Sequence, residues 1–212
     1  MMAICEKSSW SHMNPQVEFL FDYGSPFTFS YLANLQVKGF AKRNGAAVTY
    51  TPILFGALLK ATGNASPMTV PEKGRYMATE LRRCAARYGV AFKPNPHGFK
   101  SNTLRLMRGA VAAQTNGWFA LYHRAIYRAT WAEAQNLGDD TVLRELLENV
   151  GVPATTLMAD IERQEVKDRS RQKTDRAIER GVFGAPTFFV GSEMFWGNDR
   201  LDFVEEALRK LA

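Results

Sequence analysis

The amino-acid sequence predicts an α/β fold in which a β-α-β unit and a β-β-α unit flank a long helical insertion. Two short segments near the N-terminus alternate apolar and polar residues, and apolar residues at helical spacing dominate the middle. β-branched and aromatic residues then return on both sides of a Gly-Ser turn. The 212 residues suffice for one sizeable domain, or for one domain that carries a large insertion.

The first unit consists of two predicted strands joined by a helix. In "VEFLFDY" the residues Val17, Phe19 and Phe21 alternate with more polar neighbours, and "AAVTYTPIL" gives a second extended run at 48–52. Between them, "SPFTFSYLANLQVKGFAKRNG" spaces its apolar residues at helical intervals and ends on Gly45. A strand-helix-strand order favours a parallel pair with a right-handed crossover.

From about Leu54 to Arg180 the pattern is almost entirely helical, and prolines divide it into segments. The stretch "RYMATELRRCAARYG" concentrates arginines, which alternate with apolar positions at helical spacing. A solvated helix face is favoured over a nucleic-acid-binding surface, because no helix-turn-helix, zinc or RNA-binding motif accompanies these arginines. We therefore expect no nucleic-acid partner, and the net charge of +6 suits an anionic small ligand.

The C-terminal part predicts a hairpin and a closing helix. "APTFFVGSEMFWGND" turns at Gly191-Ser192, and "DRLDFVEEALRKLA" is an amphipathic helix for which Asp199 is the expected cap. These limits divide the chain into predicted parts: a leader over 1–16, an α/β domain over 17–53 and 181–212, and an inserted helical domain over 54–180.

The composition argues against several other classes of protein. No stretch approaches the roughly 18 apolar residues of a membrane span, and "MMAICEKSSWSHMNP" lacks the features of a secretory signal, so we expect a cytoplasmic protein with no membrane partner. Cys5 and Cys84 have no partner at C-x-x-C or metal-ligand spacing, and His12, His97 and His123 are scattered. We expect free thiols and no metal.

Two stretches, "FDYGSPFTFSYLA" and "GVFGAPTFFVGSEMFWGNDRL", resemble the thioredoxin-like family of kappa-class glutathione transferases and 2-hydroxychromene-2-carboxylate isomerases. "LLKATGN" (58–64) and "PEKGRYMATELRR" (71–83) extend the resemblance from about Val17 to Leu211. The run "MFWGNDRL" resembles the isomerase branch more than the transferase branch. The resemblance implies a DsbA-type thioredoxin-like fold with an inserted α-helical domain, glutathione as cofactor, and a homodimer.

Ser25 follows the first strand directly. From the residues alone, serine is a favoured helix N-cap, Pro26 suits the first helical position, and the start of a helix favours an anion. By the resemblance, Ser25 and Thr28 replace the cysteines of a C-x-x-C motif, so disulfide exchange is excluded, and the catalytic Ser25 hydroxyl donates to the sulfur of glutathione. A nucleophilic serine is the competing hypothesis, but "GSP" is not G-x-S-x-G and no second motif supplies a base.

Four cofactor-binding residues lie near the C-terminus. The resemblance implies a cis peptide between Ala185 and Pro186, with the backbone of Ala185 binding the cysteinyl backbone of glutathione as an added strand does. It places Asn198 and Asp199 at the γ-glutamyl end. From the residues alone, Pro186 is a turn or edge-strand residue, and "WGNDR" is a turn with a capping aspartate.

The remaining candidates lie nearer the substrate. By the resemblance, Asn64 and Lys73 belong around the glycyl end of glutathione and the mouth of the substrate site, although "TGN" is also a simple turn. Tyr76 and Trp196 are expected in the substrate pocket, because their amphipathic rings suit an aromatic acid. Thr28-Phe29 replaces the Ser-Tyr of the isomerase branch, a difference that concerns the second-substrate pocket.

The implied activity is a glutathione-dependent cis-trans isomerisation of 2-hydroxychromene-2-carboxylate, or of a related aromatic 2-oxo acid, in aromatic-compound catabolism. The thiolate would add to the conjugated double bond, rotation would follow, and elimination would regenerate glutathione. The alternatives are a kappa-like transferase that consumes glutathione and a non-catalytic thioredoxin-like binding module.

Overall fold

The structure, a computed structural model, describes residues 15–27, 39, 41–97 and 103–211. Its sheet has the strand order β2-β1-β3-β4. β1 pairs in parallel with β2 and antiparallel with β3, and β3 pairs antiparallel with β4, which confirms the predicted parallel pair and hairpin. The strands are β1 (Gln16–Phe21), β2 (Ala47–Pro52), β3 (Thr187–Val190) and β4 (Glu193–Trp196). The helix expected between β1 and β2 lies almost wholly outside the described residues.

The elements of secondary structure described between β2 and β3 are all helical, as the sequence predicts. They are α2 (Phe55–Thr62), the 3-10 turn η1 (Pro67–Thr69), α3 (Pro71–Tyr88), α4 (Thr103–Thr115), α5 (Phe119–Tyr127), the π-helical turn η2 (Arg128–Ala132), α6 (Asp140–Asn149), α7 (Ala154–Glu162) and α8 (Gln164–Glu179). The closing helix is α9 (Leu201–Leu211). In the part of the chain that the structure describes, no helix has both the length and the apolar composition that crossing a membrane requires.

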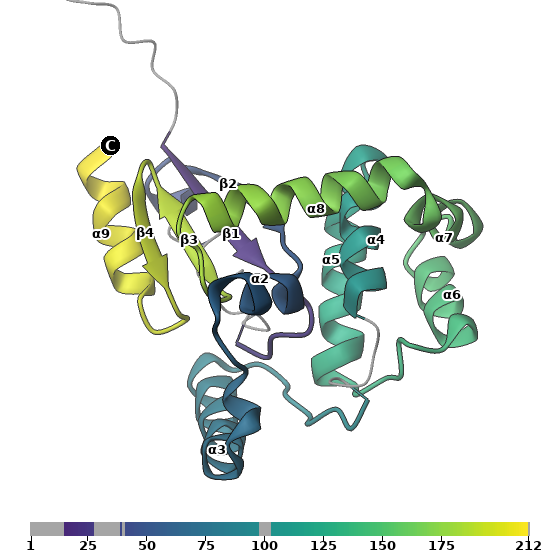
Figure 1. The fold of residues 1–212 in the computed structure, drawn as a ribbon, viewed down its shortest axis with the longest axis horizontal. Helices are drawn as coiled ribbons and strands as arrows, with labels where there is room; N and C mark the ends of the chain where they lie inside the picture. The colour runs from purple at the N-terminus through teal and green to yellow at the C-terminus, as the bar shows by residue number, and fades with distance from the viewer. Residues whose placement is uncertain (1–14, 28–38, 40, 98–102, 212) are drawn as a thin grey trace, which may run out of the picture.

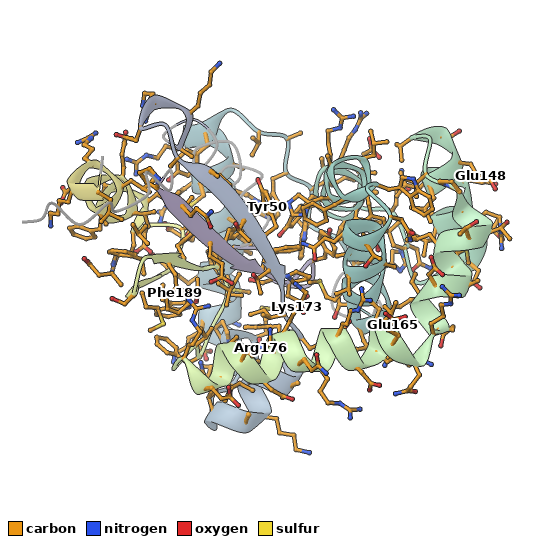
Figure 2. The ribbon with its side chains drawn as sticks, turned by 90° about the horizontal axis from the view of Figure 1, so that it is seen from above. Tyr50, Glu148, Glu165, Lys173, Arg176 and Phe189 are labelled. Carbon is orange, nitrogen blue, oxygen red and sulfur yellow. The ribbon has the colours of Figure 1, made fainter. Side chains whose placement is uncertain are left out.

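Figure 1 shows how these elements are arranged. α4, α5, α6 and α7 lie together on one side of the molecule, the sheet and α9 lie on the other, and α8 runs between the two. In Figure 2, Lys173 and Arg176 lie on the part of α8 beside the strands, whereas Glu165 lies on the part among the helices. The end of α8 is tied to β1 by an ion pair of 2.6 Å between Arg180 and Glu18.

Side chains along β1 point alternately to the two faces of the sheet. Phe19 and Phe21 are fully buried in a large cluster that also contains Val204 of α9 and Ile126 of α5. Leu20 points to the opposite face of the sheet and packs in a second cluster. Burial of large apolar side chains contributes about 1.5–3 kcal/mol for each of them, so both faces of the sheet stabilise the fold.

The second cluster brings two helices of the predicted insertion onto the sheet. Leu58 of α2 and Ala177 of α8 pack there with Leu20 of β1 and Phe189 of β3. The limits 17–53, 181–212 and 54–180 remain a prediction, and most of the leader (1–16) lies outside the described residues.

The arginines of α3 form the solvated face that the sequence predicts. Arg75, Arg82, Arg83 and Arg87 are exposed, while Met77, Leu81 and Ala85 are buried on the opposite side. Pro71 begins the helix, where its missing N–H costs nothing, and Gly89 ends it with a φ of 67°. Two of these arginines, Arg83 and Arg87, nevertheless border a cavity.

Candidate functional site

A buried carboxylate shapes the turn that carries Ser25. Asp22 Oδ1 accepts the N–H of Gly24 at 2.7 Å, and Oδ2 accepts the N–H of Phe55, the first residue of α2, at 2.9 Å. Ser25 N–H donates to the main-chain oxygen of Asp22 at 3.1 Å. Gly24 must be small, since an added Cβ would lie 2.8 Å from Thr103 Cγ2. The turn is therefore hydrogen-bonded to the start of α2 and packs closely against the start of α4.

Asp22 is a functional candidate that sequence reasoning missed. It is 2% exposed, and burial raises the pKa of its carboxyl to about 6, although the two backbone N–H groups oppose this shift. The signal in the sequence is an acidic residue directly after a strand of apolar residues, at the point where the chain must turn.

Four consecutive carbonyl groups precede β3, and each has a different hydrogen-bond donor; we call these residues the 183–186 segment. The pairs, in chain order, are Phe183 with Asn64 Nδ2 at 3.0 Å, Gly184 with Thr187 Oγ1 at 2.7 Å, Ala185 with Ser25 Oγ at 3.0 Å, and Pro186 with the N–H of Gly197 at 3.0 Å. The peptide between Ala185 and Pro186 is cis, which confirms the prediction. A hydrogen bond to each of its four carbonyl groups therefore fixes the segment.

Two predicted site residues contribute to this segment by donating to it. Ser25 is 4% exposed and its hydroxyl donates to Ala185, so the structure brings together two residues that the sequence places far apart. The helix that Ser25 was expected to cap lies outside the described residues. Asn64 Nδ2 donates to Phe183, and Asn64 Oδ1 accepts the N–H of Ala65 at 2.8 Å. The turn suggested by "TGN" does form, because Gly63 ends α2 with a φ of 66° and the N–H of Asn64 donates to Leu59 at 3.0 Å.

Asn198 and Asp199 lie in the turn between β4 and α9. Asn198 Nδ2 contacts the sulfur of Cys84 at 3.6 Å. The expected helix cap by Asp199 is wrong: α9 begins at Leu201, which puts Asp199 one residue before the N-cap position, and its carboxylate pairs with Arg200 at 2.5 Å. The turn itself is fixed to the 183–186 segment through Gly197, whose φ of 106° favours glycine.

Two cavities meet at Ala185 and Trp196. We call them the α3 cavity, of about 950 Å³, and the Ser25 cavity, of about 610 Å³. Every predicted site residue borders at least one of them. The α3 cavity is bordered by Tyr76, Pro186, Asn198 and Asp199, the Ser25 cavity by Ser25, Asn64 and Lys73, and both by Ala185 and Trp196.

One stripe of α3 faces the α3 cavity. Tyr76, Glu80, Arg83, Cys84 and Arg87 recur at helical spacing along it. Sequence reasoning chose only Tyr76 from this stripe, and the same spacing would have found the others. Burial raises the pKa of the Cys84 thiol, so this cysteine is protonated near neutral pH.

The two predicted pocket aromatics are largely exposed. Tyr76 is 62% exposed, and its hydroxyl donates to Glu80 at 3.3 Å. Trp196 is 50% exposed, and its ring lies 5.0 Å from the ring of Phe183. A third cavity, of about 440 Å³, is bordered by Tyr76 and Lys73. Exposed rings beside cavities are available to a ligand.

The mixed sheet, the cis-proline before β3 and the contact of that segment with the turn after β1 define a thioredoxin-fold protein. Cys5 and Cys84 are the only cysteines of the sequence, so the turn after β1 holds no redox-active cysteine pair. The protein is therefore of the thioredoxin-fold class, with a serine, Ser25, in the turn after β1 that contacts the residue before the cis-proline.

Comparison with known proteins specifies this class. A family model for the DsbA-like thioredoxin domain matches residues 16–209. A 2-hydroxychromene-2-carboxylate isomerase from Sphingobium xenophagum is 34% identical over 198 residues, covering 92% of this chain and 99% of that protein. A solved 2-hydroxychromene-2-carboxylate isomerase structure has a TM-score of 0.82 at 31% identity, covering 92% of this chain and 95% of that one. The chain belongs to the DsbA-like thioredoxin family and, within it, to the family of the 2-hydroxychromene-2-carboxylate isomerases.

A more distant relative belongs to the kappa-class transferases. Glutathione S-transferase kappa 1 from Caenorhabditis elegans is 24% identical over 208 residues, covering 92% of each chain. These findings agree with the resemblance noted in the sequence, including its preference for the isomerase branch.

Proposed function

We propose that this protein is a glutathione-dependent cis-trans isomerase of 2-hydroxychromene-2-carboxylate, or of a related aromatic 2-oxo acid, in aromatic-compound catabolism. The observation that carries the proposal is the hydrogen bond from Ser25 to Ala185, which lies beside two cavities. Charged side chains border the α3 cavity, and the Ser25 hydroxyl borders the other. Membership in the isomerase family supports it. A cytoplasmic location and a homodimer complete the proposal, as the sequence and the family resemblance suggest.

The side chains around the α3 cavity fit one end of glutathione. Glutathione carries two carboxylates, one ammonium group and one thiol. Arg83 and Arg87 provide cations for a carboxylate, and Asp199 provides an anion for the ammonium group. Asn198 supplies an amide that pairs with either group. The γ-glutamyl end therefore belongs in the α3 cavity.

The Ser25 cavity suits the other end of glutathione and the thiol. Ala185 offers main-chain groups for strand-like pairing with the cysteinyl residue, and Asn64 and Lys73 lie on the side where the glycyl carboxylate would lie. When bound, glutathione supplies a thiolate that adds reversibly to the conjugated double bond and so permits rotation.

Ser25 has one hydrogen to donate, and this limits what it does. In the structure this hydrogen goes to the carbonyl oxygen of Ala185. A ligand N–H that takes over the Ala185 oxygen releases the Ser25 hydroxyl to donate to a sulfur anion beside it. A hydrogen bond to the charged form lowers the pKa of a thiol, so Ser25 would hold the thiol as a thiolate near neutral pH.

Three side chains suit the aromatic acid. Trp196 and Tyr76 offer exposed rings. Lys73 borders both the Ser25 cavity and the third cavity, so its ammonium group is shared between the glycyl carboxylate of glutathione and the carboxylate of the acid. An aromatic ring packs on such side chains, while the ammonium group of Lys73 orients the 2-oxo acid end.

The experiment that tests the proposal is turnover of the chromene acid with glutathione at a concentration far below that of substrate. We expect isomerisation over many turnovers, with the free thiol concentration unchanged. Loss of one thiol for each turnover would instead indicate a kappa-like transferase. Absence of turnover with intact glutathione binding would indicate a non-catalytic binding module.

A further inference from the structure

The indole of Trp196 lies directly on the main chain of Gly184. A Cβ added at Gly184 would lie 2.3 Å from Trp196 Nε1, and 3.0 Å and 3.1 Å from Cε2 and Cδ1 of the same ring. Real Cβ atoms do not approach a ring this closely. The ring therefore occupies the space that any side chain at position 184 would need.

The backbone gives no other reason for a glycine at this position. Gly184 is not among the glycines with a positive φ, unlike Gly191 and Gly197 on either side of β4. Its carbonyl oxygen accepts from Thr187, a bond that any residue could make. What requires a glycine here is the approach of the indole.

The position of the indole matters because Trp196 borders both main cavities. Trp196 is the last residue of β4 and pairs with Thr187 of β3, so its main chain is held by the sheet while its ring is half exposed. The ring is fixed on its inner side by Gly184 and by Phe183. A ring held against rigid main chain presents one defined face to a ligand.

We propose that Gly184 is a positioning residue that sets the Trp196 ring and thereby the preference of this site for aromatic over aliphatic 2-oxo acids. This inference rests on the proposed function for its ligand. A methyl group at position 184 displaces the ring and leaves the donors to the 183–186 segment in place. The effect on glutathione is smaller than the effect on the aromatic acid, because Gly184 borders the Ser25 cavity but contributes none of the groups assigned to glutathione.

The test combines Gly184→Ala, Trp196→Leu and the double variant. The matched control is Gly74→Ala on α3, where an added Cβ meets Met68 Sδ at an ordinary 3.4 Å. Binding of phenylpyruvate, 4-methyl-2-oxopentanoate and glutathione is measured by calorimetry. The emission of Trp196 without ligand, taken as the difference between each protein and its Trp196→Leu counterpart, reports the ring position.

In Gly184→Ala we expect a shifted Trp196 emission and phenylpyruvate binding weakened about five- to tenfold, the size of one aromatic contact. We expect less than about a twofold change for the aliphatic acid and for glutathione. Gly184→Ala should add nothing to the loss caused by Trp196→Leu. Gly74→Ala should behave as the wild type does in all of these measurements.

Three results would overturn the inference: unchanged Trp196 emission in Gly184→Ala, losses that add in the double variant, or a wild type that binds the two acids equally. If Gly184→Ala does not fold, folding of the double variant supports the inference and its failure overturns it. An inactive wild type that gives all the expected binding and emission results would contradict only the isomerase function.

Discussion

The hydroxyl of Ser25 donates a 3.0 Å hydrogen bond to the carbonyl oxygen of Ala185, across a separation of 160 residues in sequence. This bond joins the turn after β1 to the residue before the cis-proline, and both groups are buried. It brings a serine hydroxyl and a main-chain carbonyl together at the border of the Ser25 cavity.

Ser25→Ala should separate glutathione binding from thiol activation. Because most proposed contacts come from other residues, we expect binding to change little. The pKa of the bound thiol should rise by about one to two units, with a matching fall in rate near neutral pH, since each unit corresponds to about 1.4 kcal/mol. Titration of thiolate absorbance alongside the isomerisation rate measures both quantities.

The control for this variant is Ser170→Ala. Ser170 is also buried, and its hydroxyl donates to Val166 within α8. Both variants should lose about 0.5–1.5 kcal/mol of stability with the hydrogen bond. If Ser25→Ala and the control have the same pKa of the bound thiol and the same isomerisation rate, Ser25 serves only to hold the 183–186 segment.

Asp22→Asn should change how stability depends on pH. Burial raises the pKa of Asp22 to about 6 from an ordinary 3.8, so between these values the folded protein binds more protons than the unfolded chain. This carboxyl therefore adds stability at low pH that is lost as pH rises from about 4 to about 6. A shift of this size corresponds to about 3 kcal/mol.

Without this carboxyl, the Asp22→Asn variant should gain stability relative to wild type as pH rises through that window. Urea unfolding at pH 4, 5, 6 and 7 measures the difference. Asp175→Asn, at an exposed position on α8, is the control and should follow the wild type. If the difference in the free energy of unfolding between wild type and Asp22→Asn is constant across the window, Asp22 has the same pKa in the folded and unfolded states.

Asp199→Asn should weaken glutathione binding without unfolding the protein. Its side chain is 67% exposed, and its pair with Arg200 is a surface ion pair that contributes at most about 1 kcal/mol. Loss of a charge-assisted contact to the ammonium group should cost about 1.5–3 kcal/mol of binding. Calorimetry measures the change, with Glu206→Gln on α9 as control, and an unaltered affinity would limit Asp199 to its surface pair.

Arg87→Gln tests whether the arginines that border the α3 cavity attract the γ-glutamyl carboxylate. We expect glutathione affinity to fall about two- to fivefold at low salt, as for an exposed ion pair, and the difference to shrink at high salt. Arg75 on the same helix pairs with Glu72 and does not border this cavity, so Arg75→Gln should leave the affinity unchanged. Equal losses in the two variants would indicate a general charge effect.

Glutathione itself should stabilise the folded protein. A ligand that binds only the native state adds about 2.7 kcal/mol at a hundredfold excess over Kd, which for a chain of this size raises Tm by roughly 5–10 °C. A melting curve in millimolar glutathione measures this, with an equal ionic strength of sodium chloride as control. If Tm does not move, the glutathione-dependent functions are all excluded.

Local patterns predicted much of the sheet. The alternation of Val17, Phe19 and Phe21 predicts a strand with one buried face, and Gly191-Ser192 between β-branched and aromatic residues predicts the hairpin. Both signals are local, because side-chain direction along a strand and turn conformation depend on adjacent residues. Helical periodicity predicted the long helical segment and the closing helix, and the family resemblance supplied the site residues, including the role of Ser25 and the cis peptide before Pro186.

The tertiary structure alone decided which groups meet. Asp22 bonds to Phe55 and Trp196 lies on Gly184 because strand pairing and helix packing bring those segments together. Such contacts depend on where whole elements lie in space, and no periodicity or composition near either residue records the identity of a partner far along the chain.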